Sequence, residues 1–249
     1  MASNARRYDE DMTETIYSTD AYAQKMAATV VRTDTDDNRI LLDRTVFYPG
    51  GGGQPHDTGI LSIGDDLLIV SRVTSDRDGV WHWIDGSIPQ QGTVLSGSID
   101  WERRYKLMRT HTALHALCGV VWNRFRAPVT GGNMQPGEGR LDFDIPDWTA
   151  EDLPIVEREL NEELAKHRQI EVSFLPRDAA DEDPSLIRTK VNLLPKFIEQ
   201  VRVIDIVGLD RQADGGTHVG QTGEVGAIVI PKAENKGRGF RRIRVRLEE

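Results

Sequence analysis

The stretch GSIDWERRYKLMRTHTALHALCGVVWNRF, residues 97–125, decides the fold because the residue pattern changes within it. Asp100 is a suitable N-cap, and Glu102 places a negative charge in the first helical turn, where the helix dipole favours it. The less polar side chains then recur at steps of three and four residues: Leu107, His111, Leu114, Cys118 and Val121. This spacing predicts an amphipathic helix from Trp101 to about Phe125.

The residues before this helix have the pattern of short β-strands. Apolar, β-rich runs are separated by turn-forming segments: 34–38, 50–55, 76–79 and 85–87. Strands at this spacing are typical of a small antiparallel barrel or sandwich, and we predict a β-barrel domain over residues 21–98 behind a polar leader of residues 1–20. Three tryptophans are expected to close its core: Trp81, Trp83 and Trp101.

The residues after the helix alternate between helix and strand patterns. Thr149 is the expected cap of a second helix, whose apolar side chains share one face: Val156, Leu160 and Leu164. Four later runs alternate like strands: 170–175, 200–208, 225–230 and 241–247. We therefore predict an α+β domain over residues 99–249, with helices packed on an antiparallel sheet, and α+β as the fold class of the chain.

The amino-acid composition limits where the protein can be located and which partners it can bind. The 249 residues carry a net charge of −9 at pH 7, so binding of nucleic acid by bulk charge is excluded and any RNA must meet a local basic patch. One cysteine, Cys118, excludes an intrachain disulfide and a zinc site made of cysteines alone. The polar N-terminus resembles neither a secretory signal nor a membrane span, and we expect a cytoplasmic protein. A GxxxxGK[ST] phosphate loop is absent from the sequence, which argues against an NTPase.

Two histidines spaced four residues apart form the first candidate site. On a helix, His111 and His115 project to the same side, within reach of one metal ion. Thr112 stands where a zinc metalloprotease needs a glutamate, so that activity is excluded. Downstream, the segment DGGTH supplies Asp214 and His218, and its glycines permit a tight turn that directs both side chains inward. Three histidines and a carboxylate are a reasonable ligand set for zinc; the alternative is a partly buried histidine pair and an ordinary glycine-rich turn.

The segment TVFYPGGGGQP, residues 45–55, contains four consecutive glycines. A tight turn would account for them. The functional alternative is a loop whose bare amides, at Gly51, Gly52 and Gly53, approach a ligand while Gln54 supplies a polar contact. Composition alone does not distinguish the two.

Taken together, these motifs resemble one family. TVFYPGGGGQP, HTALH and GGTHVGQTGEVG, followed by the tail IVIPKAENKGRGFRRIRVRLEE, resemble the editing region of alanyl-tRNA synthetase and its free-standing relatives, the AlaX alanyl-tRNA editing proteins. The resemblance runs from about Thr45 to the C-terminus, with the motifs in family order. The length resembles that of the medium-sized AlaX class, in which a β-barrel precedes the editing domain.

The resemblance implies hydrolysis of the ester that joins a wrong amino acid to the alanine tRNA, with seryl-tRNA as the first candidate and glycyl-tRNA as the second. It also implies one Zn²⁺ ion, held by both histidines of an HxxxH pair and by the cysteine and histidine of a CxGTH motif. His111, His115 and His218 match these ligands, whereas Asp214 occupies the cysteine position. This exchange replaces a soft ligand with a hard one and lets other divalent ions compete better.

The physical need for such an enzyme is that a pocket for alanine rejects serine by only about 10²-fold, so a second sieve is required. The resemblance assigns Thr45 to the contact with the serine hydroxyl, although a β-branched residue in a strand is the plain structural alternative. Thr45 and Gln54 are our catalytic candidates. The residues expected to line the substrate pocket are Gly51, Gly52 and Gly53.

Two basic clusters are the candidates for contact with tRNA phosphates. One precedes the histidine pair and contains Arg103 and Arg104, and the other lies near the C-terminus: Lys232, Lys236, Arg238, Arg241 and Arg242. The alternative is a set of charged strand edges that resist aggregation.

Two other functions stay open. One is a tRNA-binding module that has lost catalysis together with its cysteine, and the other is a hydrolase of the same fold that acts on a different aminoacyl ester. Neither ATP consumption nor membrane association is expected.

Overall fold

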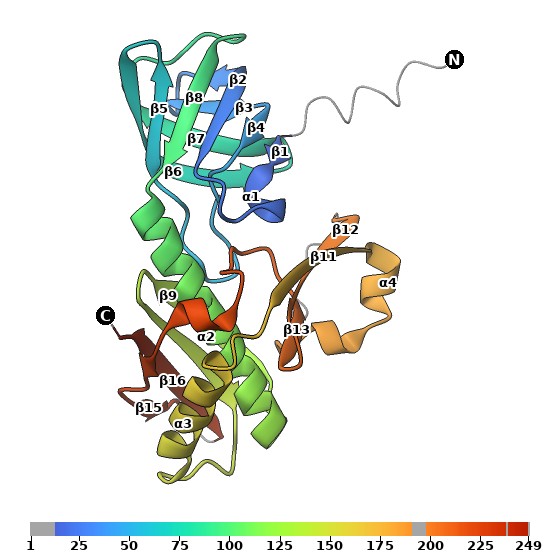
Figure 1. Cartoon of the computed structure of the whole chain (residues 1–249). Helices are drawn as coiled ribbons and strands as arrows, with labels where there is room; N and C mark the ends of the chain where they lie inside the picture. Colours follow the sequence, from blue (N-terminus) through green and yellow to red (C-terminus); the bar gives the residue numbers. More distant parts are fainter. Residues whose placement is uncertain (1–12, 191–197, 238, 249) are drawn as a thin grey trace. The chain divides into compact units, whose positions relative to one another are not determined.

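A computed structural model describes residues 13–190, 198–237 and 239–248 (Figure 1). The chain divides into two compact units. The first contains the residues up to Gly51 and Pro55–Arg104, and the second contains Gly52–Gln54 and Tyr105–Glu249. A short piece of the glycine-rich segment therefore belongs to the second unit, although the residues on both sides of it belong to the first.

The first unit is a closed antiparallel barrel of six strands, as predicted (Figure 1). Around the barrel the strands follow the order β2, β3, β7, β6, β5 and β8. Their bounds are Lys25–Asp34 for β2, Arg39–Leu42 for β3, Gly59–Ile63 for β5, Asp66–Asp76 for β6, Gly79–Asp85 for β7 and Val94–Ile99 for β8. Strand β1 (Glu14–Thr15), which pairs in parallel with β4 (Arg44–Thr45), and helix α1 (Ile16–Thr19) complete the unit.

The barrel core contains one histidine and excludes two of the predicted tryptophans. Along β7, Val80, His82 and Ile84 are buried on the inner side. Trp81 and Trp83 occupy the alternate positions, where the guanidinium of Arg39 lies 4.5 Å and 5.1 Å from their ring centroids. Trp81 is buried all the same, with 3% of its surface exposed, whereas Trp83 is half-buried. The prediction that both close the inner core of the barrel is wrong, because arginines of neighbouring strands cover them from outside. The third tryptophan, Trp101, does pack against the core.

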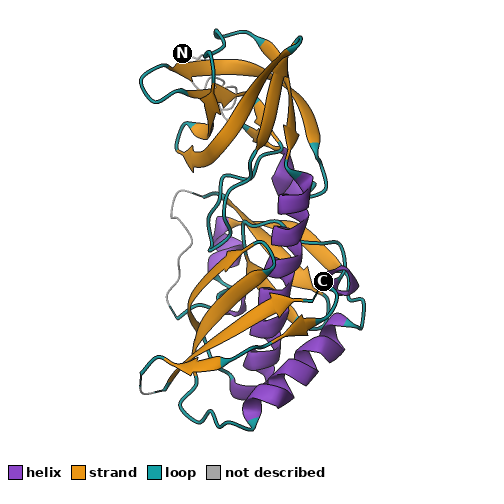
Figure 2. Cartoon of the chain, turned by 90° about the vertical axis from the view of Figure 1, so that its left-hand side faces the viewer, coloured by secondary structure: helices purple, strands orange, loops and turns teal. Residues whose placement is uncertain are grey.

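Helix α2 (Trp101–Phe125) has the predicted bounds, and the second unit is built around its part from Tyr105 onward. A five-stranded antiparallel sheet packs on α2 in the order β14–β16–β10–β9, with β15 also paired to β16 (Figure 2). The bounds are Val129–Gln135 for β9, Glu138–Asp144 for β10, Ile228–Val229 for β14, Ala233–Asn235 for β15 and Phe240–Leu247 for β16. Gly139 permits this close packing, because a Cβ atom there would lie 2.9 Å from the side chain of Leu114.

A three-stranded antiparallel sheet completes the second unit. It contains, in spatial order, β11 (Ile170–Pro176), β12 (Gln200–Ile206) and β13 (Asp210–Ala213). Helices α3 (Asp152–Leu164) and α4 (Arg177–Asp181) and the 3₁₀ turns η1 (Pro184–Leu186) and η2 (Thr222–Val225) connect the strands. Gly119 of α2 leaves room for Leu209 and Asp210, whose side chains lie 2.9 Å from the position of its missing Cβ. This approach places the start of β13 against α2.

Two predicted elements differ from the structure. The strand expected over 225–230 shrinks to β14, because η2 occupies Thr222–Val225 and is closed by a capping box between Gln221 and Glu224. The second helix starts at Asp152 rather than at Thr149, whose backbone NH and hydroxyl both donate to Asp152 Oδ2. The α+β class is confirmed.

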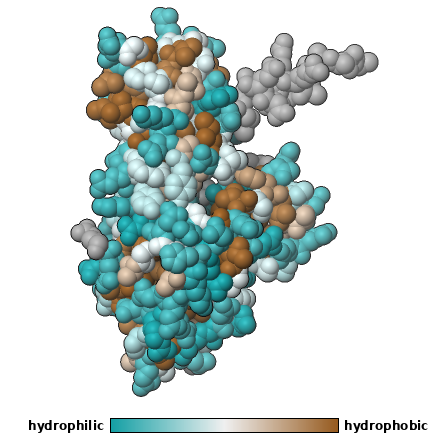
Figure 3. Space-filling view, viewed as in Figure 1, coloured by the Kyte–Doolittle hydropathy of each residue, from teal (hydrophilic) through white to brown (hydrophobic). Residues whose placement is uncertain are grey.

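The second unit presents a mostly hydrophilic face in the space-filling view (Figure 3). None of the described helices combines the length and the apolar character that crossing a membrane requires.

Candidate metal centre

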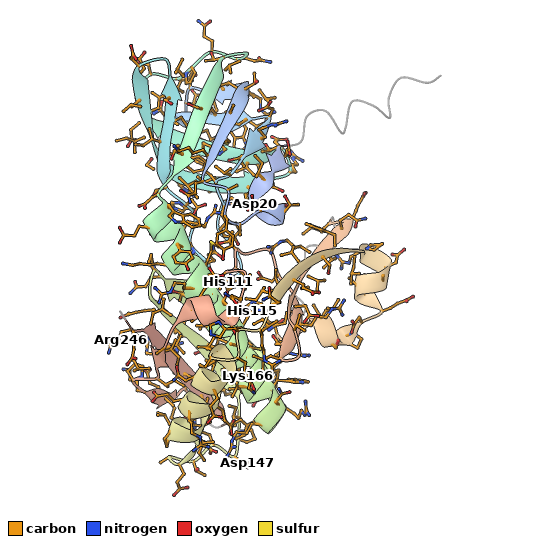
Figure 4. All side chains as sticks on the ribbon, viewed as in Figure 1. Asp20, His111, His115, Asp147, Lys166 and Arg246 are labelled. Carbon is orange, nitrogen blue, oxygen red and sulfur yellow. The ribbon has the colours of Figure 1, made fainter. Side chains whose placement is uncertain are left out.

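Four potential metal ligands converge in the second unit. His111 and His115 lie one turn apart on α2 (Figure 4), Asp214 directly follows β13, and His218 lies four residues further on. Their ligand atoms all lie within 4.8 Å of one another. The Asp214 oxygens lie 3.6 Å from His111 Nε2, 3.9 Å from His115 Nε2 and 3.2 Å from His218 Nε2. The structure thus brings together the four residues that the sequence singled out as ligands.

The donor set suits a zinc ion. Nitrogen and oxygen ligands bind zinc at about 2.0–2.2 Å in a tetrahedron, which places neighbouring ligand atoms roughly 3.3–3.5 Å apart. The observed separations of 3.2–3.9 Å between Asp214 and the three imidazoles need only small side-chain adjustments to reach that geometry.

The electrostatics of the site favour the protonation states that metal binding needs. Burial lowers the pKa of His111 and of His115, and it lowers that of His218 well below its usual value. Burial by itself would raise the pKa of Asp214, but the adjacent His111 and the hydrogen bond with His218 outweigh it and hold that pKa well below its usual range. Neutral imidazoles and an ionised carboxylate are the forms that bind metals.

Gln54 holds His111 from behind. Its Oε1 accepts a hydrogen bond from the backbone NH of Thr217, and its Nε2 donates to Thr217 Oγ1, so the orientation of the amide is determined. His111 Nδ1 lies 3.0 Å from the same Oε1 and must therefore donate to it. With its proton on Nδ1, His111 presents the lone pair of Nε2 to the cluster, which is the usual tautomer of a metal-binding histidine whose other nitrogen is hydrogen-bonded.

Thr112 offers the equivalent support to His218. Its Oγ1 lies 3.1 Å from His218 Nδ1 and also accepts from the backbone NH of Val219. Arg202 orders the same loop, because its Nη1 donates to the backbone oxygens of Asp214 and Gly216. Neither role was predicted from the sequence, although an arginine between two valines of a strand-like run, at Val201–Val203, was a usable signal.

Glycines are required on both sides of the cluster. A Cβ atom on Gly216 would lie 2.2 Å from the His111 ring and 2.7 Å from Gln54 Oε1, so no other residue fits there. The four glycines from Gly50 to Gly53 all have positive φ, between 56° and 132°, a conformation that glycine adopts without strain. Gly52 lies beside Asp214, with 3.7 Å between its missing Cβ and Oδ1, whereas Gly51 belongs to the first unit.

Thr45 belongs to the first unit, as do the predicted site residues Gly51, Arg103 and Arg104. Its side chain is fully buried, its hydroxyl lies 2.8 Å from His82 Nε2, and its Oγ1 accepts from the backbone NH of Phe47. This pairing of Thr45 with His82 could not be predicted from the sequence, because nothing in the pattern of either strand indicates that both face the barrel core.

Among the predicted RNA contacts, Arg104 requires correction. It is fully buried and forms an ion pair with Asp57, and it also donates to the backbone oxygens of Ala21 and Val46. A buried arginine with these partners cannot also bind a phosphate on the surface. Arg103 donates to the backbone oxygen of His56.

The basic residues near the C-terminus have mixed surroundings. Arg242 donates to both carboxylate oxygens of Asp142 at 2.7 and 2.8 Å, and Lys232 forms an ion pair of 2.8 Å with Glu234. Lys236 is exposed and Arg241 is half-buried. Arg238 lies outside the described residues.

Comparisons with known proteins show which family this chain is related to. Residues 201–244 match the family described as threonyl and alanyl tRNA synthetase second additional domain, and residues 2–103 match class II (A) tRNA synthetases. The alanyl-tRNA editing protein AlaX-M of Saccharolobus solfataricus is 37% identical over 93% of this chain and 98% of its own. AlaX-M of Methanosarcina barkeri is 35% identical with the same coverage, and the alanine–tRNA ligase of Pyrococcus furiosus is 34% identical over 93% of this chain and 25% of its own.

Proposed function

Because the chain belongs to the AlaX-M family of alanyl-tRNA editing proteins, we propose that it hydrolyses the ester of mischarged alanine tRNA, seryl-tRNA first and glycyl-tRNA second. It is an aminoacyl-tRNA deacylase, and its partner is the acceptor end of the alanine tRNA in the cytoplasm. The observation that carries the proposal is the convergence of three histidines and Asp214 beside the glycine-rich loop, in a chain of this family.

The cluster would hold one zinc ion through His111, His115, Asp214 and His218. When bound, zinc supplies a Lewis acid that polarises an ester carbonyl and lowers the pKa of water. Gln54 acts here as a positioning residue: both ends of its amide are engaged by Thr217 and His111, so it holds an imidazole rather than meeting the substrate.

Asp214 is the ligand that would open the zinc site to water or substrate. A site closed by four strong ligands has no position for water or substrate, whereas catalytic zinc sites keep one open. A carboxylate is a harder and weaker partner for zinc than a thiolate, so Asp214 is the ligand that would yield its position. Gly52 leaves the space beside that carboxylate free for the aminoacyl group.

Thr45 stays a prediction in this scheme. Its hydroxyl is engaged by His82 inside the barrel, so a contact with the hydroxyl of a serine substrate would require this pair to open.

The test is deacylation of the alanine tRNA charged with serine, with glycine or with alanine, by protein of measured zinc content. We expect serine to be released at least about 100-fold faster than alanine, the ratio at which editing adds usefully to selection by size. Failure of zinc-loaded protein to release any of the three would overturn the proposed activity, and equal release of serine and alanine would remove the editing role.

The variant Asp214→Cys tests the ligand role of this position. It introduces the cysteine of the CxGTH motif. We expect zinc to bind roughly tenfold more tightly, because thiolate is the softer ligand. The measurement is competition with a chelator of known affinity, with Asp214→Asn as the matched control that removes the charge and gains no sulfur. An unchanged zinc affinity in both variants would show that Asp214 is not a ligand.

A further inference from the structure

We propose that the outer face of the sheet formed by β9, β10 and β16 is a binding groove for the phosphodiester backbone of the single-stranded RNA end that carries the ester. This inference rests on the proposed function and adds a site to it. The three strands run side by side, and Figure 2 shows them in front of α2, with the outer face toward the viewer.

Strand alternation sorts the residues of this sheet cleanly. Ile243 and Val245 of β16 and Phe143 of β10 are buried toward α2. The intervening side chains form a polar grid on the other face, in which the register pairs Glu138 with Arg246, Arg140 with Arg244 and Asp142 with Arg242. On β9, Gln135 lies opposite Glu138 and Asn133 lies opposite Arg140.

A groove of about 270 Å³ follows this grid. Its charged lining consists of three arginines, Arg140, Arg244 and Arg246, against one acid, Glu138. The amides of Asn133 and Gln135 also line it. On a chain with a net charge of −9, this local excess of positive charge is what a polyanion needs in order to bind.

The arrangement of the arginines indicates an anionic ligand. Arg140 and Arg244 lie directly opposite each other, and like charges in that position destabilise a sheet. Asp142 and Glu234 compensate them only in part, because Asp142 also holds Arg242 and Glu234 also holds Lys232. Arg246 is exposed, projects outward in Figure 4 and forms no ion pair with a residue that the structure describes.

The glycine-rich loop contacts both the metal centre and strand β9, whose residues line the groove. The backbone oxygen of Gly53 accepts a hydrogen bond from the NH of Met134, one of the groove residues. The missing Cβ of Gly53 lies 3.6 Å from the Cα of Asn133, and that of the preceding Gly52 lies 3.7 Å from the Asp214 carboxylate. Gly52 and Gly53 therefore lie between Asp214 and the β9 edge of the groove, and an RNA end whose terminal ester lies at the cluster would pass this loop to reach the arginines.

The double variant Arg140→Gln/Arg246→Gln tests the groove, and Arg158→Gln on α3, which removes an exposed arginine of the same unit, is the matched control. The substrates are seryl-tRNA and seryl-adenosine, which has the ester but no phosphodiester. We expect kcat/KM for the tRNA to fall roughly 10- to 100-fold in the double variant, and the slope of log(kcat/KM) against log salt to become shallower by about one to two units. For seryl-adenosine we expect a change of less than about twofold. An equal loss on both substrates, or no loss on the tRNA, would overturn the proposal.

A binding measurement separates failure of the groove from failure of the proposed function. The probe is a fluorescent RNA hairpin of the acceptor stem with its unpaired 3′ end, and it needs no hydrolysis. We expect the double variant to bind it about tenfold more weakly than the control variant, and a blunt hairpin without the unpaired end to show little difference between the two variants. Equal weakening for both hairpins would assign the arginines to the duplex, and equal weakening for polyglutamate would assign them to acidic partners in general. Either result would overturn the proposal, even if the protein proved inactive.

Discussion

Both units bury histidines, but they do so in opposite ways. In the barrel, His82 is fully buried with Thr45 as its hydrogen-bond partner, and its Nδ1 has no partner among the described residues. In the second unit, His111, His115 and His218 surround the carboxylate of Asp214. Burial lowers the pKa of every one of these histidines, so a shifted pKa does not distinguish the two regions. What distinguishes the second unit is that three imidazoles converge on the carboxylate of Asp214.

The largest expected effect comes from breaking the convergence. The substitution His115→Ala removes one of four ligands, and we expect it to abolish stoichiometric zinc binding and to lower kcat/KM on seryl-tRNA by about 10³-fold or more, corresponding to several kcal/mol of lost transition-state stabilisation. Metal analysis of the purified protein and the deacylation assay measure the two effects. The control is His82→Leu, which we expect to keep its zinc; if both variants lost it equally, the contrast between the two regions would be wrong.

A second expected effect lies in the barrel and depends on pH. Burial lowers the pKa of His82 to about 4, whereas an unfolded chain binds a proton on this histidine below about 6.5. Protonation of His82 in the unfolded chain therefore lowers the free energy of unfolding as the pH falls from about 6.5 toward 4. The loss is at most about 3 kcal/mol, and above pH 6.5 there is none. Urea unfolding at several pH values should show that His82→Leu flattens the fall in unfolding free energy relative to the wild type. The same slope in both proteins would show that His82 does not control it.

The smallest expected effect sharpens the description of the metal centre. If Gln54 and Thr112 hold imidazoles for a metal, then Gln54→Ala and Thr112→Val should each weaken zinc binding by about 10- to 100-fold, as is typical when the residues behind metal ligands are lost. Thr112→Ser keeps the hydroxyl and should restore most of the affinity. Chelator competition measures all three. A rate defect in Gln54→Ala with normal zinc affinity would return Gln54 to a direct catalytic role.

Local pattern predicted much of this molecule. The periodicity after Asp100 predicted α2 with its observed bounds, and the short β-rich runs predicted the barrel, because each signal lies within one element. The i, i+4 spacing and the DGGTH turn predicted which side chains meet at the cluster.

What the sequence could not predict depends on pairings between distant segments. Trp81 and Trp83 look like core residues until the register brings Arg39 onto them. Arg104 looks like an RNA contact until Asp57, 47 residues away, is found beside it. The support that Gln54 gives to His111 spans 57 residues, and no local pattern carries such information.

The path of the chain also limits how this protein can be divided. Gly52–Gln54 belong to the second unit, although the segments on both sides of them form the barrel unit, so the backbone enters the second unit twice. A truncated protein that began at Trp101 would keep all four metal ligands yet lack the amide that holds His111. Deleting the chain before Trp101 would therefore remove Gln54 together with the barrel. The two units are compact bodies, but no single cut in the chain separates them completely.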